Sequence, residues 1–428
     1  MERIVINGGR KLGGKIRVSG AKNAALPILF ATILAEDVCI IENLPEISDV
    51  TDSLEILRAM GASVTMLDLT TAKIDTTHIV CGTAPYELSS AMRGSYYVLG
   101  AELSRFGKAR SAIPGGCDFG VRPIDQHIKG FTALGADVAT DNGYVVCDCH
   151  GRPRGAGIYL DMESVGATIN IMLAACKAEG QTVIDNAARE PHIVDLANFL
   201  NACGADISGA GTSVIKIKGT KRLHGVTYAI IPDMIEAGTY MIAAAATKSH
   251  VEITNVIPKH LESVTAKLLE MGVDVVENDE SVVVDGDNEP TPVRVKTLPY
   301  PGFPTDMNPQ MCALMCLAQG TSYMNEGVFE NRFRYTGELA KMGASIKVDG
   351  KMAVIEGLGK LQGACVRAVD LRAGAAMVIA GLAAEGVTYI EDIRHIERGY
   401  EDLVGKLASA GADIRRETVP EEAVQKAN

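Results

Sequence analysis

The most regular feature of the chain is a helix-like segment with hydrophobic residues on one face that ends at a glycine. Ala or Val follows each of these glycines, and the next residues alternate as in a strand. Glycine at this position accepts the left-handed backbone conformation that ends many helices. The glycines are Gly61, Gly135, Gly204, Gly272, Gly343 and Gly411, at intervals of 74, 69, 68, 71 and 68 residues. This regularity predicts six internal repeats.

A second series of helical segments runs in phase with the first and is hydrophobic on nearly every face. Helices of this kind belong at the centre of a domain. They begin near Lys22, Arg93, Ser164, Glu236, Asp306 and Arg372. Most lead into a strand-like segment, as in VEITNVIP or VTYIEDI. Each repeat thus combines a buried helix, an amphipathic helix and strands, which predicts a mixed α/β fold.

The number of repeats also predicts the domain organisation. A single core seldom grows beyond about 250 to 300 residues, so six repeats divide most naturally into two domains of three. We expect an N-terminal domain over residues 22–229 and a C-terminal domain over residues 230–428. Residues 1–21 have no counterpart among the repeats, and we expect them to pair with the C-terminal domain.

Composition narrows the class of protein. The 428 residues are 47% hydrophobic and 22% charged, which indicates a large buried core and argues against disorder. A net charge of −12, no Trp and 5% aromatic residues argue against a nucleic-acid binder. The sequence lacks a signal-peptide block and an apolar run long enough to cross a membrane, so we expect a cytoplasmic protein. In that compartment the ten Cys are expected to be reduced.

Polar residues stand where the buried helices begin. Helix N-termini present free N–H groups and the positive end of the helix dipole, so each is a potential anion site. If three such ends in each domain faced a shared cleft, the site would favour a polyanionic substrate. The alternative is that each residue only caps or solvates its helix, which is the commoner role for any one of them. The residues are Lys22, Asn23, Arg93, Ser164, Asp306 and Arg372.

A Gly-rich segment, IPGGCDFGVRPIDQH over residues 113–127, interrupts the second repeat. Cys117 lies there between Gly116 and Asp118, with Arg122 nearby in sequence, so it is the thiol placed for exposure and reactivity. The alternative is an incidental loop thiol. The other nine Cys are expected in strands or apolar helices as small buried hydrophobes. A loop that carries a reactive group over a cleft often acts as a lid.

Other polar signals are interpreted as structural. Cys147, Cys149 and His150 match no common zinc spacing and alternate as in a strand. Cys312 and Cys316 lie one helical turn apart and are expected to be packing residues. The same interpretation applies to His127. No GxGxxG follows a strand and no GxxxxGK[ST] occurs, so Rossmann and Walker nucleotide sites lack support. We expect neither a metal nor an organic cofactor.

Together these motifs resemble those of the UDP-N-acetylglucosamine 1-carboxyvinyltransferase family, the enolpyruvyl transferases that begin peptidoglycan synthesis. The shared motifs, in order, are SGAKNAALPILFA, PGGCxxGxRPxDxH, SVGAT, DNAARE, FPTDMNPQ, FENRF and HIERGYE, and they span nearly the whole chain. The resemblance implies two inside-out α/β barrels, each of three repeated units with central helices and outer sheets. It places the active site in the cleft between the domains.

The implied reaction transfers the enolpyruvyl group of phosphoenolpyruvate to the 3′-hydroxyl of UDP-N-acetylglucosamine and releases phosphate. It proceeds by addition and elimination through a tetrahedral intermediate. Such a reaction needs an acid for C3, a base for the sugar hydroxyl, and cations around the phosphate and carboxylate groups. The resemblance also implies roles in cell wall biogenesis, cell shape and cell division, and alkylation of Cys117 by fosfomycin.

The resemblance assigns the catalytic roles. Cys117 would protonate C3 and could form a covalent phosphoenolpyruvate adduct, while Asp306 would act as, or orient, the base at the 3′-hydroxyl. Asp370 would orient neighbouring cations. Lys22, Arg122 and Arg398 would hold the phosphate, while Arg332 and Arg372 would hold or pre-position the carboxylate. Arg suits these roles because its guanidinium fork binds such anions bidentately. The catalytic set is Cys117, Asp306, Lys22 and Arg398, and the phosphoenolpyruvate-binding set is Lys22, Asn23, Arg122, Arg332, Arg372 and Arg398.

The resemblance likewise implies a site for the sugar nucleotide. It uses a uracil-binding stretch at residues 122–126, a diphosphate-binding turn at residues 164–166, and a backbone contact from Val328 to the sugar. The implied residues are Asn23, Arg93, Arg122, Pro123, Ile124, Asp125, Gln126, Ser164, Val165, Gly166, Asp306 and Val328. Met162 and Met234 depart from the family, which often has Lys and Arg there, and this puts nucleotide affinity in question.

Two other functions remain open from the sequence. The first is the sister reaction, enolpyruvyl transfer to shikimate 3-phosphate, against which the PGGC and RPIDQ motifs count. The second is a catalytically silent regulatory paralogue that binds a UDP-sugar, against which the presence of Lys22, Cys117, Asp306 and Arg398 counts. The sequence does not specify the oligomeric state.

Overall fold

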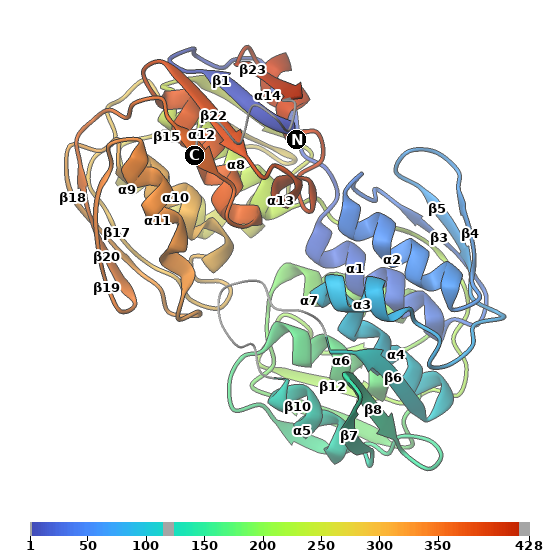
Figure 1. Ribbon diagram of the computed structural model, residues 1–428. Coiled ribbons are helices and arrows are strands. Elements are labelled where there is room, and N and C mark those ends of the chain that lie inside the picture. Colours follow the sequence, from blue (N-terminus) through green and yellow to red (C-terminus); the bar gives the residue numbers. More distant parts are fainter. Residues whose placement is uncertain (1, 114–123, 419–428) are drawn as a thin grey trace. The chain divides into compact units, whose positions relative to one another are not determined.

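The computed structural model describes residues 2–113 and 124–418, which fall into two compact units. The N-terminal unit comprises residues 20–113 and 124–231, and the C-terminal unit comprises residues 2–19 and 232–418. Both units alternate helices with strands (Figure 1), so the predicted mixed α/β fold is confirmed. Among the described residues no helix is long and apolar enough to cross a membrane.

Three sheets belong to the C-terminal unit. The first is formed by β2 (Lys15–Arg17), β14 (His250–Thr254), β15 (Asp274–Glu277) and β16 (Ser281–Asp285). The second is formed by β17 (Arg294–Lys296), β18 (Gly320–Asn325), β19 (Ser345–Asp349) and β20 (Met352–Gly357). The third is formed by β1 (Glu2–Asn7), β21 (Cys365–Arg367), β22 (Val387–Glu391) and β23 (Asp413–Thr418).

The helices of this unit fall into the two predicted series. The buried helices are α8 (Met234–Ala246), α10 (Asn308–Met315) and α12 (Leu371–Ala383), which pack on one another. The amphipathic helices are α9 (Glu262–Glu270), α11 (Thr336–Lys341) and α14 (Leu403–Ser409). The remaining short helices are η3 (Pro258–Leu261), η4 (Thr305–Met307), η5 (Arg332–Tyr335) and α13 (Arg394–Glu397). In Figure 1 the buried helices lie between the strands of their own unit.

The N-terminal unit repeats this plan. Its sheets are β3 (Val38–Glu42), β4 (Ser63–Met66), β5 (Ala72–Asp75) and β13 (Thr227–Ala229); β6 (Lys108–Ala112), β7 (Asp137–Asp141) and β8 (Tyr144–Asp148); and β9 (Gly157–Tyr159), β10 (Gln181–Asp185), β11 (Asp206–Ser208) and β12 (Val214–Lys218). Its helices are α1 (Lys22–Ala31), η1 (Thr32–Leu34), α2 (Ser48–Ala59), α3 (Tyr86–Ala91), η2 (Arg93–Tyr96), α4 (Tyr97–Phe106), α5 (Asp125–Ala133), α6 (Val165–Ala175) and α7 (Pro191–Ala202).

One strand pattern recurs in every four-stranded sheet. One strand pairs antiparallel with two neighbours, and a fourth strand pairs parallel with one of these neighbours. In the third sheet of the C-terminal unit the antiparallel place is taken by β1, which pairs with β22 and β23. The strand β1 therefore lies in the same sheet as the strands of the last repeat.

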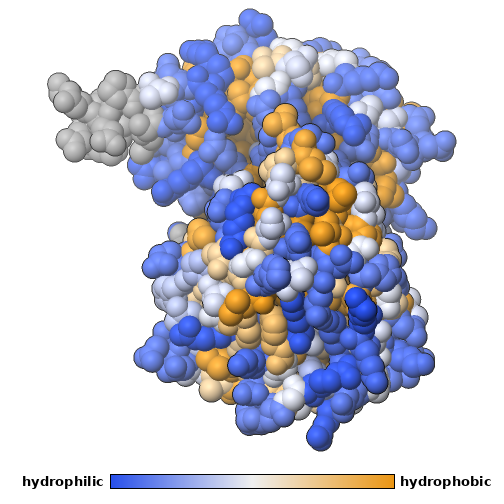
Figure 2. All heavy atoms as spheres, turned by 90° about the vertical axis from the view of Figure 1, so that its right-hand side faces the viewer, coloured by the Kyte–Doolittle hydropathy of each residue, from blue (hydrophilic) through white to orange (hydrophobic). Residues whose placement is uncertain are grey.

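The repeat glycines have the backbone conformation that the sequence predicts. They follow α2, α5, α7, α9, α11 and α14, and their φ angles lie between 82° and 105°. The buried helices are also confirmed, because every residue of α8 from Ile235 to Ala246 is buried. Each unit has its own hydrophobic cluster. Hydrophilic residues cover most of the face shown in Figure 2, with smaller groups of hydrophobic residues between them.

The expectation for the nine other cysteines is partly wrong. Cys365 is exposed in β21, where strand alternation turns it away from the core. Cys81 and Cys149 are half-buried and lie outside helices and strands. Cys312 and Cys316 are confirmed as buried residues of α10 and its C-terminal end, and burial raises the pKa of the Cys312 thiol to about 12. Such thiols pack as small hydrophobes.

Candidate functional site

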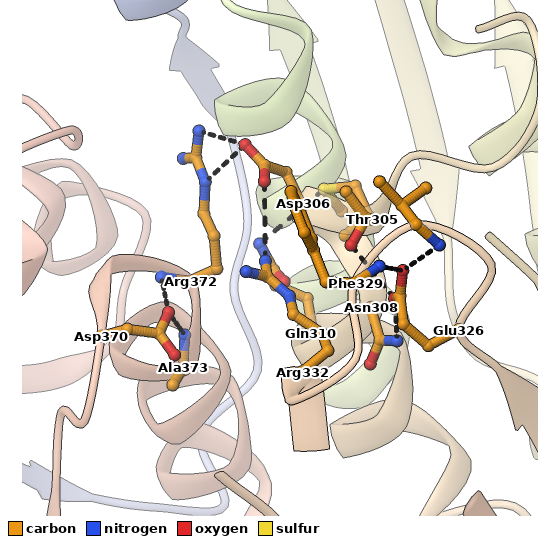
Figure 3. Close-up of polar contacts among 12 residues, drawn as sticks. Thr305, Asp306, Asn308, Gln310, Glu326, Phe329, Arg332, Asp370, Arg372 and Ala373 are labelled. Carbon is orange, nitrogen blue, oxygen red and sulfur yellow. Dashed lines mark hydrogen bonds and ion pairs between the residues drawn. The ribbon is translucent and has the colours of Figure 1, made fainter. Parts of the chain in front are cut away.

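Three predicted site residues of the C-terminal unit come together at the starts of separate helices. Asp306 lies in η4 before α10, Arg332 begins η5, and Arg372 is the second residue of α12. Asp306 Oδ2 accepts hydrogen bonds from Arg372 Nε at 3.2 Å and Nη2 at 3.0 Å. Arg332 Nη2 lies 3.5 Å from Asp306 Oδ1. Figure 3 shows the carboxylate between the two guanidinium groups.

The burial of these groups makes their charges strongly coupled. The side chains of Arg332 and Arg372 are only 2% and 4% exposed, whereas that of Asp306 is 30% exposed. Burial disfavours the charged form of Arg372, but the Asp306 carboxylate, together with Tyr400 and Asp233, outweighs it, so the pKa of this guanidinium lies above its ordinary value. The ring of Tyr400 lies beneath the guanidinium, 5.4 Å from it. The site therefore holds two fixed cations around one partly exposed carboxylate.

Asp370 acts on this group through the backbone. Its side chain caps α12 by accepting hydrogen bonds from the N–H groups of Arg372 at 2.8 Å and Ala373 at 2.9 Å. A carboxylate at this position satisfies free N–H groups and opposes the positive end of the helix dipole. These two contacts fix the helix start that carries Arg372.

Two further predicted residues of this unit lie near turns. Val328 is in the loop after β18, and its N–H donates to Glu326 Oε1 at 2.9 Å. Arg398 directly follows α13 and is half-buried. Sequence reasoning missed Glu326, a buried acid at the end of a strand, because its surrounding sequence carries no pattern that distinguishes a buried acid from an exposed one.

In the N-terminal unit, Lys22 begins α1 and pairs with an acid that was not predicted. Its Nζ lies 2.5 Å from Oδ2 of Asp49, in the first turn of α2. The two side chains are 12% and 4% exposed. Asn23 follows Lys22 and is half-buried. The ammonium group is thus held in place by a contact between residues far apart in sequence.

His127, interpreted from the sequence as a packing residue, is buried and also makes a side-chain contact with Asn170. Burial, aided by the charge of Arg93, lowers the pKa of its imidazole to about 4, so the ring is neutral at pH 7. Asn170 Oδ1 accepts from the N–H of Gly100 at 3.0 Å, so the amide presents Nδ2 to His127 Nδ1, 2.9 Å away. We assign the ring proton to Nε2 on this basis.

The predicted diphosphate turn lies beside this ring. Ser164 caps α6, its Oγ accepting from Ala167 N at 3.3 Å, and Val165 and Gly166 are the first residues of the helix. A Cβ on Gly166 would lie 3.1 Å from His127 Nε2. The structure thus brings Gly166 close to His127, while Ser164 has the capping role that was the alternative for such residues.

The predicted uracil stretch is only partly described, since Cys117, Arg122 and Pro123 lie outside the described residues. Ile124 precedes α5, and Asp125 and Gln126 begin it. Gln126 exchanges hydrogen bonds of 3.0 Å with the side chain and N–H of Asp161, and Lys129 Nζ lies 2.8 Å from the same carboxylate. This network joins α5 to the residue before Met162.

The described residues contain no group of three or more His, Cys, Asp or Glu side chains that could hold a metal ion. His150, one of the discounted candidates, instead has its Nε2 2.8 Å from Asp137 Oδ2. Neither finding points to a metal centre in the part of the chain that is described.

Comparisons with known proteins all match the chain to carboxyvinyltransferases. Residues 6–407 match the family described as EPSP synthase (3-phosphoshikimate 1-carboxyvinyltransferase). The chain is 55% identical over 416 residues to UDP-N-acetylglucosamine 1-carboxyvinyltransferase 3 of Caldanaerobacter subterraneus subsp. tengcongensis, covering 97% of this chain and 99% of the relative. It is 54% identical over 417 residues to UDP-N-acetylglucosamine 1-carboxyvinyltransferase of Clostridium botulinum, covering 97% and 100%.

Two solved structures have the same fold. The enolpyruvyl transferase NikO from Streptomyces tendae superposes with a TM-score of 0.88 at 29% identity, covering 98% of this chain and 99% of that chain. EPSP synthase from Acinetobacter baumannii superposes with a TM-score of 0.76 at 21% identity, covering 98% and 100%. The second likeness shows the fold alone.

Proposed function

Since the chain belongs to the UDP-N-acetylglucosamine 1-carboxyvinyltransferase family of enolpyruvyl transferases, we propose that it transfers the enolpyruvyl group of phosphoenolpyruvate to the 3′-hydroxyl of UDP-N-acetylglucosamine and releases phosphate. The resemblance predicted from the motifs is thereby confirmed. Identity above one half over nearly the full length of both chains supports this acceptor in preference to shikimate 3-phosphate.

The observation that carries the proposal is the Asp306 carboxylate held between Arg372 and Arg332. Two cations within 4 Å favour the ionised carboxylate, which can accept or orient the proton of the 3′-hydroxyl. The same guanidinium groups can bind the carboxylate of phosphoenolpyruvate, because their donors form forks. One cluster thus supplies both the base and the anion contacts that the reaction needs.

Residues outside this cluster supply the remaining groups in this proposal. Lys22, positioned by Asp49, contacts the phosphate of phosphoenolpyruvate together with Arg122 and Arg398. Cys117 donates the proton to C3, which makes C2 electrophilic toward the sugar oxygen. The 3′ oxygen then bonds to C2 as its proton passes to the base. In the elimination step C3 loses a proton while the bond from C2 to the phosphate oxygen breaks, and phosphate leaves.

The sugar nucleotide is held by a second set of groups. The N-terminus of α6 and the imidazole Nε2–H of His127 suit a diphosphate, since both present hydrogen-bond donors and the helix end is electropositive. Asn23 and the backbone of Val328 contact the sugar, and residues 122–126 contact uracil. Arg93 is a further nucleotide contact.

We also propose that the chain forms two inside-out α/β barrels. The first comprises residues 22–229, and the second comprises residues 1–21 with residues 230–428. The recurring strand pattern, and the division of the described chain after residues 19 and 231, support this arrangement. We place the enzyme in the cytoplasm, in peptidoglycan synthesis and hence in cell shape and division. The substrates are its only proposed partners.

The test is phosphate release from phosphoenolpyruvate with UDP-N-acetylglucosamine as acceptor and shikimate 3-phosphate in a parallel reaction. Release that depends on the UDP-sugar alone supports the proposal. Release that depends on shikimate 3-phosphate alone overturns the assigned acceptor. Silence with both, combined with tight binding of the UDP-sugar, would indicate the regulatory paralogue instead.

A further inference from the structure

Glu326 is a fully buried acid directly after β18, with 0% of its surface exposed. Its Oε2 accepts hydrogen bonds from Thr305 Oγ1 at 3.1 Å and Asn308 Nδ2 at 2.8 Å. Its Oε1 accepts from the N–H groups of Val328 at 2.9 Å and Phe329 at 3.1 Å (Figure 3). A buried carboxylate is costly unless its lone pairs are satisfied, and these four donors satisfy them.

The four donors come from two segments that carry proposed site residues. Thr305 and Asn308 lie on either side of Asp306 in the chain, at the start of η4 and the start of α10. Val328 and Phe329 form the loop whose backbone is proposed to contact the sugar. One carboxylate therefore joins the proposed base to a loop that would fix the position of its substrate.

A third segment is joined through Asn308. Its Oδ1 accepts a hydrogen bond from the hydroxyl of Tyr335 at 2.6 Å, and Tyr335 ends the short helix that Arg332 begins. Tyr335 and Asn308 are both 0% exposed. Because Nδ2 of Asn308 faces Glu326 and Oδ1 faces Tyr335, the amide connects the carboxylate to the segment of Arg332.

We propose that Glu326 is a positioning residue that holds Asp306, the Val328 loop and the Arg332 segment in the geometry required for transfer; this inference rests on the proposed function. Glu326 does not react, since its oxygens are occupied by protein donors. It acts by keeping the carboxylate of Asp306 aligned with the acceptor hydroxyl. A misplacement of about 1 Å at a reacting centre can cost about 10²-fold in rate.

The hydrogen-bond pattern allows a test with substitutions that keep the size of each side chain and change only its donors and acceptors. In Glu326→Gln the single amide oxygen must face Val328 and Phe329, because backbone N–H groups cannot reverse. The new NH₂ group then faces Nδ2 of Asn308, donor against donor. Adding Asn308→Asp supplies a carboxylate that accepts from this NH₂ group and still accepts from Tyr335. The double variant thus restores a complete network, while each single variant breaks it.

The experiment measures kcat and KM in the phosphate-release assay for the full chain, the two single variants and the double variant. We expect kcat of each single variant to fall roughly 10- to 100-fold. KM for UDP-N-acetylglucosamine should stay within about threefold of the wild-type value, because the substitutions disturb the alignment of Asp306 more than they disturb nucleotide binding. The double variant should regain at least about tenfold over either single variant. Glu277→Gln, an exposed acid at the end of β15, is the matched control and should leave both constants unchanged.

Circular dichroism and thermal unfolding of each variant separate alignment from folding. Unchanged kcat per folded molecule in both single variants, or no recovery in the double variant, would overturn the proposal. Should the single variants fail to fold, Thr305→Val removes one donor only, and an unchanged kcat in that variant would equally overturn it. Reduced kcat with unchanged KM in Thr305→Val would support it.

The wild-type chain, run first in the same assay, separates this inference from the proposed function. Should it use shikimate 3-phosphate instead, the assigned acceptor fails. The same kcat ratios measured with that acceptor would then still decide whether Glu326 aligns Asp306.

Discussion

Asp306 Oδ2 accepts hydrogen bonds from both Nε and Nη2 of Arg372, at 3.2 and 3.0 Å. The arrangement neutralises a guanidinium group that is almost fully buried and would be costly without a counter-charge. It also leaves the carboxylate, 30% exposed, accessible from one side. The same contact therefore gives the buried guanidinium group a counter-charge and keeps an accessible carboxylate beside a cation.

Asp306→Asn should abolish most turnover. An amide cannot take the proton of the 3′-hydroxyl, so we expect kcat to fall by roughly 10²- to 10⁴-fold. Binding of UDP-N-acetylglucosamine, measured by calorimetry, should change by only about threefold, because most nucleotide contacts lie elsewhere. Asp279→Asn, in the exposed turn between β15 and β16, is the control. Turnover of Asp306→Asn at the wild-type rate would remove this carboxylate from the chemistry.

Asp49→Asn should weaken the use of phosphoenolpyruvate and the fold together. Asp49 Oδ2 lies 2.5 Å from Lys22 Nζ, and loss of one partner of a largely buried pair costs about 3–5 kcal/mol in the free energy of unfolding. We expect KM for phosphoenolpyruvate to rise by about tenfold, a loss of about 1.4 kcal/mol in binding. Steady-state kinetics and urea unfolding measure the two effects.

Glu55→Gln is the matched control for this change, since Glu55 forms an exposed ion pair with Arg58 on the same helix. A surface pair of this kind contributes less than about 0.5 kcal/mol. Equal effects of the two substitutions would show that the Lys22 pair has no special role.

The buried Glu102 of α4 should make stability depend on pH. Burial raises the pKa of its carboxyl to about 7 from a usual 4.5, although the N–H groups of Arg110 and Gly82 oppose this. Between these values the folded state holds a proton that the unfolded state has lost, so the free energy of unfolding falls as pH rises. Relative to Glu102→Gln, the wild type should lose on the order of 3 kcal/mol between pH 4.5 and 7.

Urea unfolding of both proteins at several pH values gives this difference directly. A wild-type stability that rises relative to the variant over the same interval would have the wrong sign and would contradict the assignment.

Two repeat glycines should differ in how well they tolerate alanine. Gly272 has φ of +82° with nothing within 4 Å of an added Cβ, so Gly272→Ala should cost only the left-handed strain, about 1–2 kcal/mol. Gly61 has φ of +105°, and its Cβ would lie 2.7 Å from the carbonyl oxygen of His78. Gly61→Ala should therefore lower the urea midpoint further than Gly272→Ala. Equal midpoints would contradict the steric argument.

The elements were largely predictable from the sequence because they depend on local pattern. The glycine at position 61 and its counterparts mark helix ends whatever surrounds them, and helices that are apolar on all faces, such as α8, have no stable place except the core. The motif resemblance grouped Asp306, Arg332 and Arg372, and the structure brings these three side chains together.

What could not be predicted depends on contacts between residues far apart in sequence. Asp49 looks like an ordinary acid in the first turn of an amphipathic helix, and only the packing of α1 on α2 places it against Lys22. Glu326 looks like a surface acid after a strand, and its burial follows from the positions of η4 and the Val328 loop. No local pattern carries this information.

The most direct test of the central claim is a nuclear magnetic resonance spectrum of the products formed from phosphoenolpyruvate and UDP-N-acetylglucosamine in deuterated water. We predict equal amounts of phosphate and an enolpyruvyl ether at the 3′ oxygen. Its vinyl group should contain deuterium, because C3 gains a proton from an exchangeable acid before elimination. Phosphate without the ether, or an ether whose vinyl group contains no deuterium, would contradict enolpyruvyl transfer by addition and elimination.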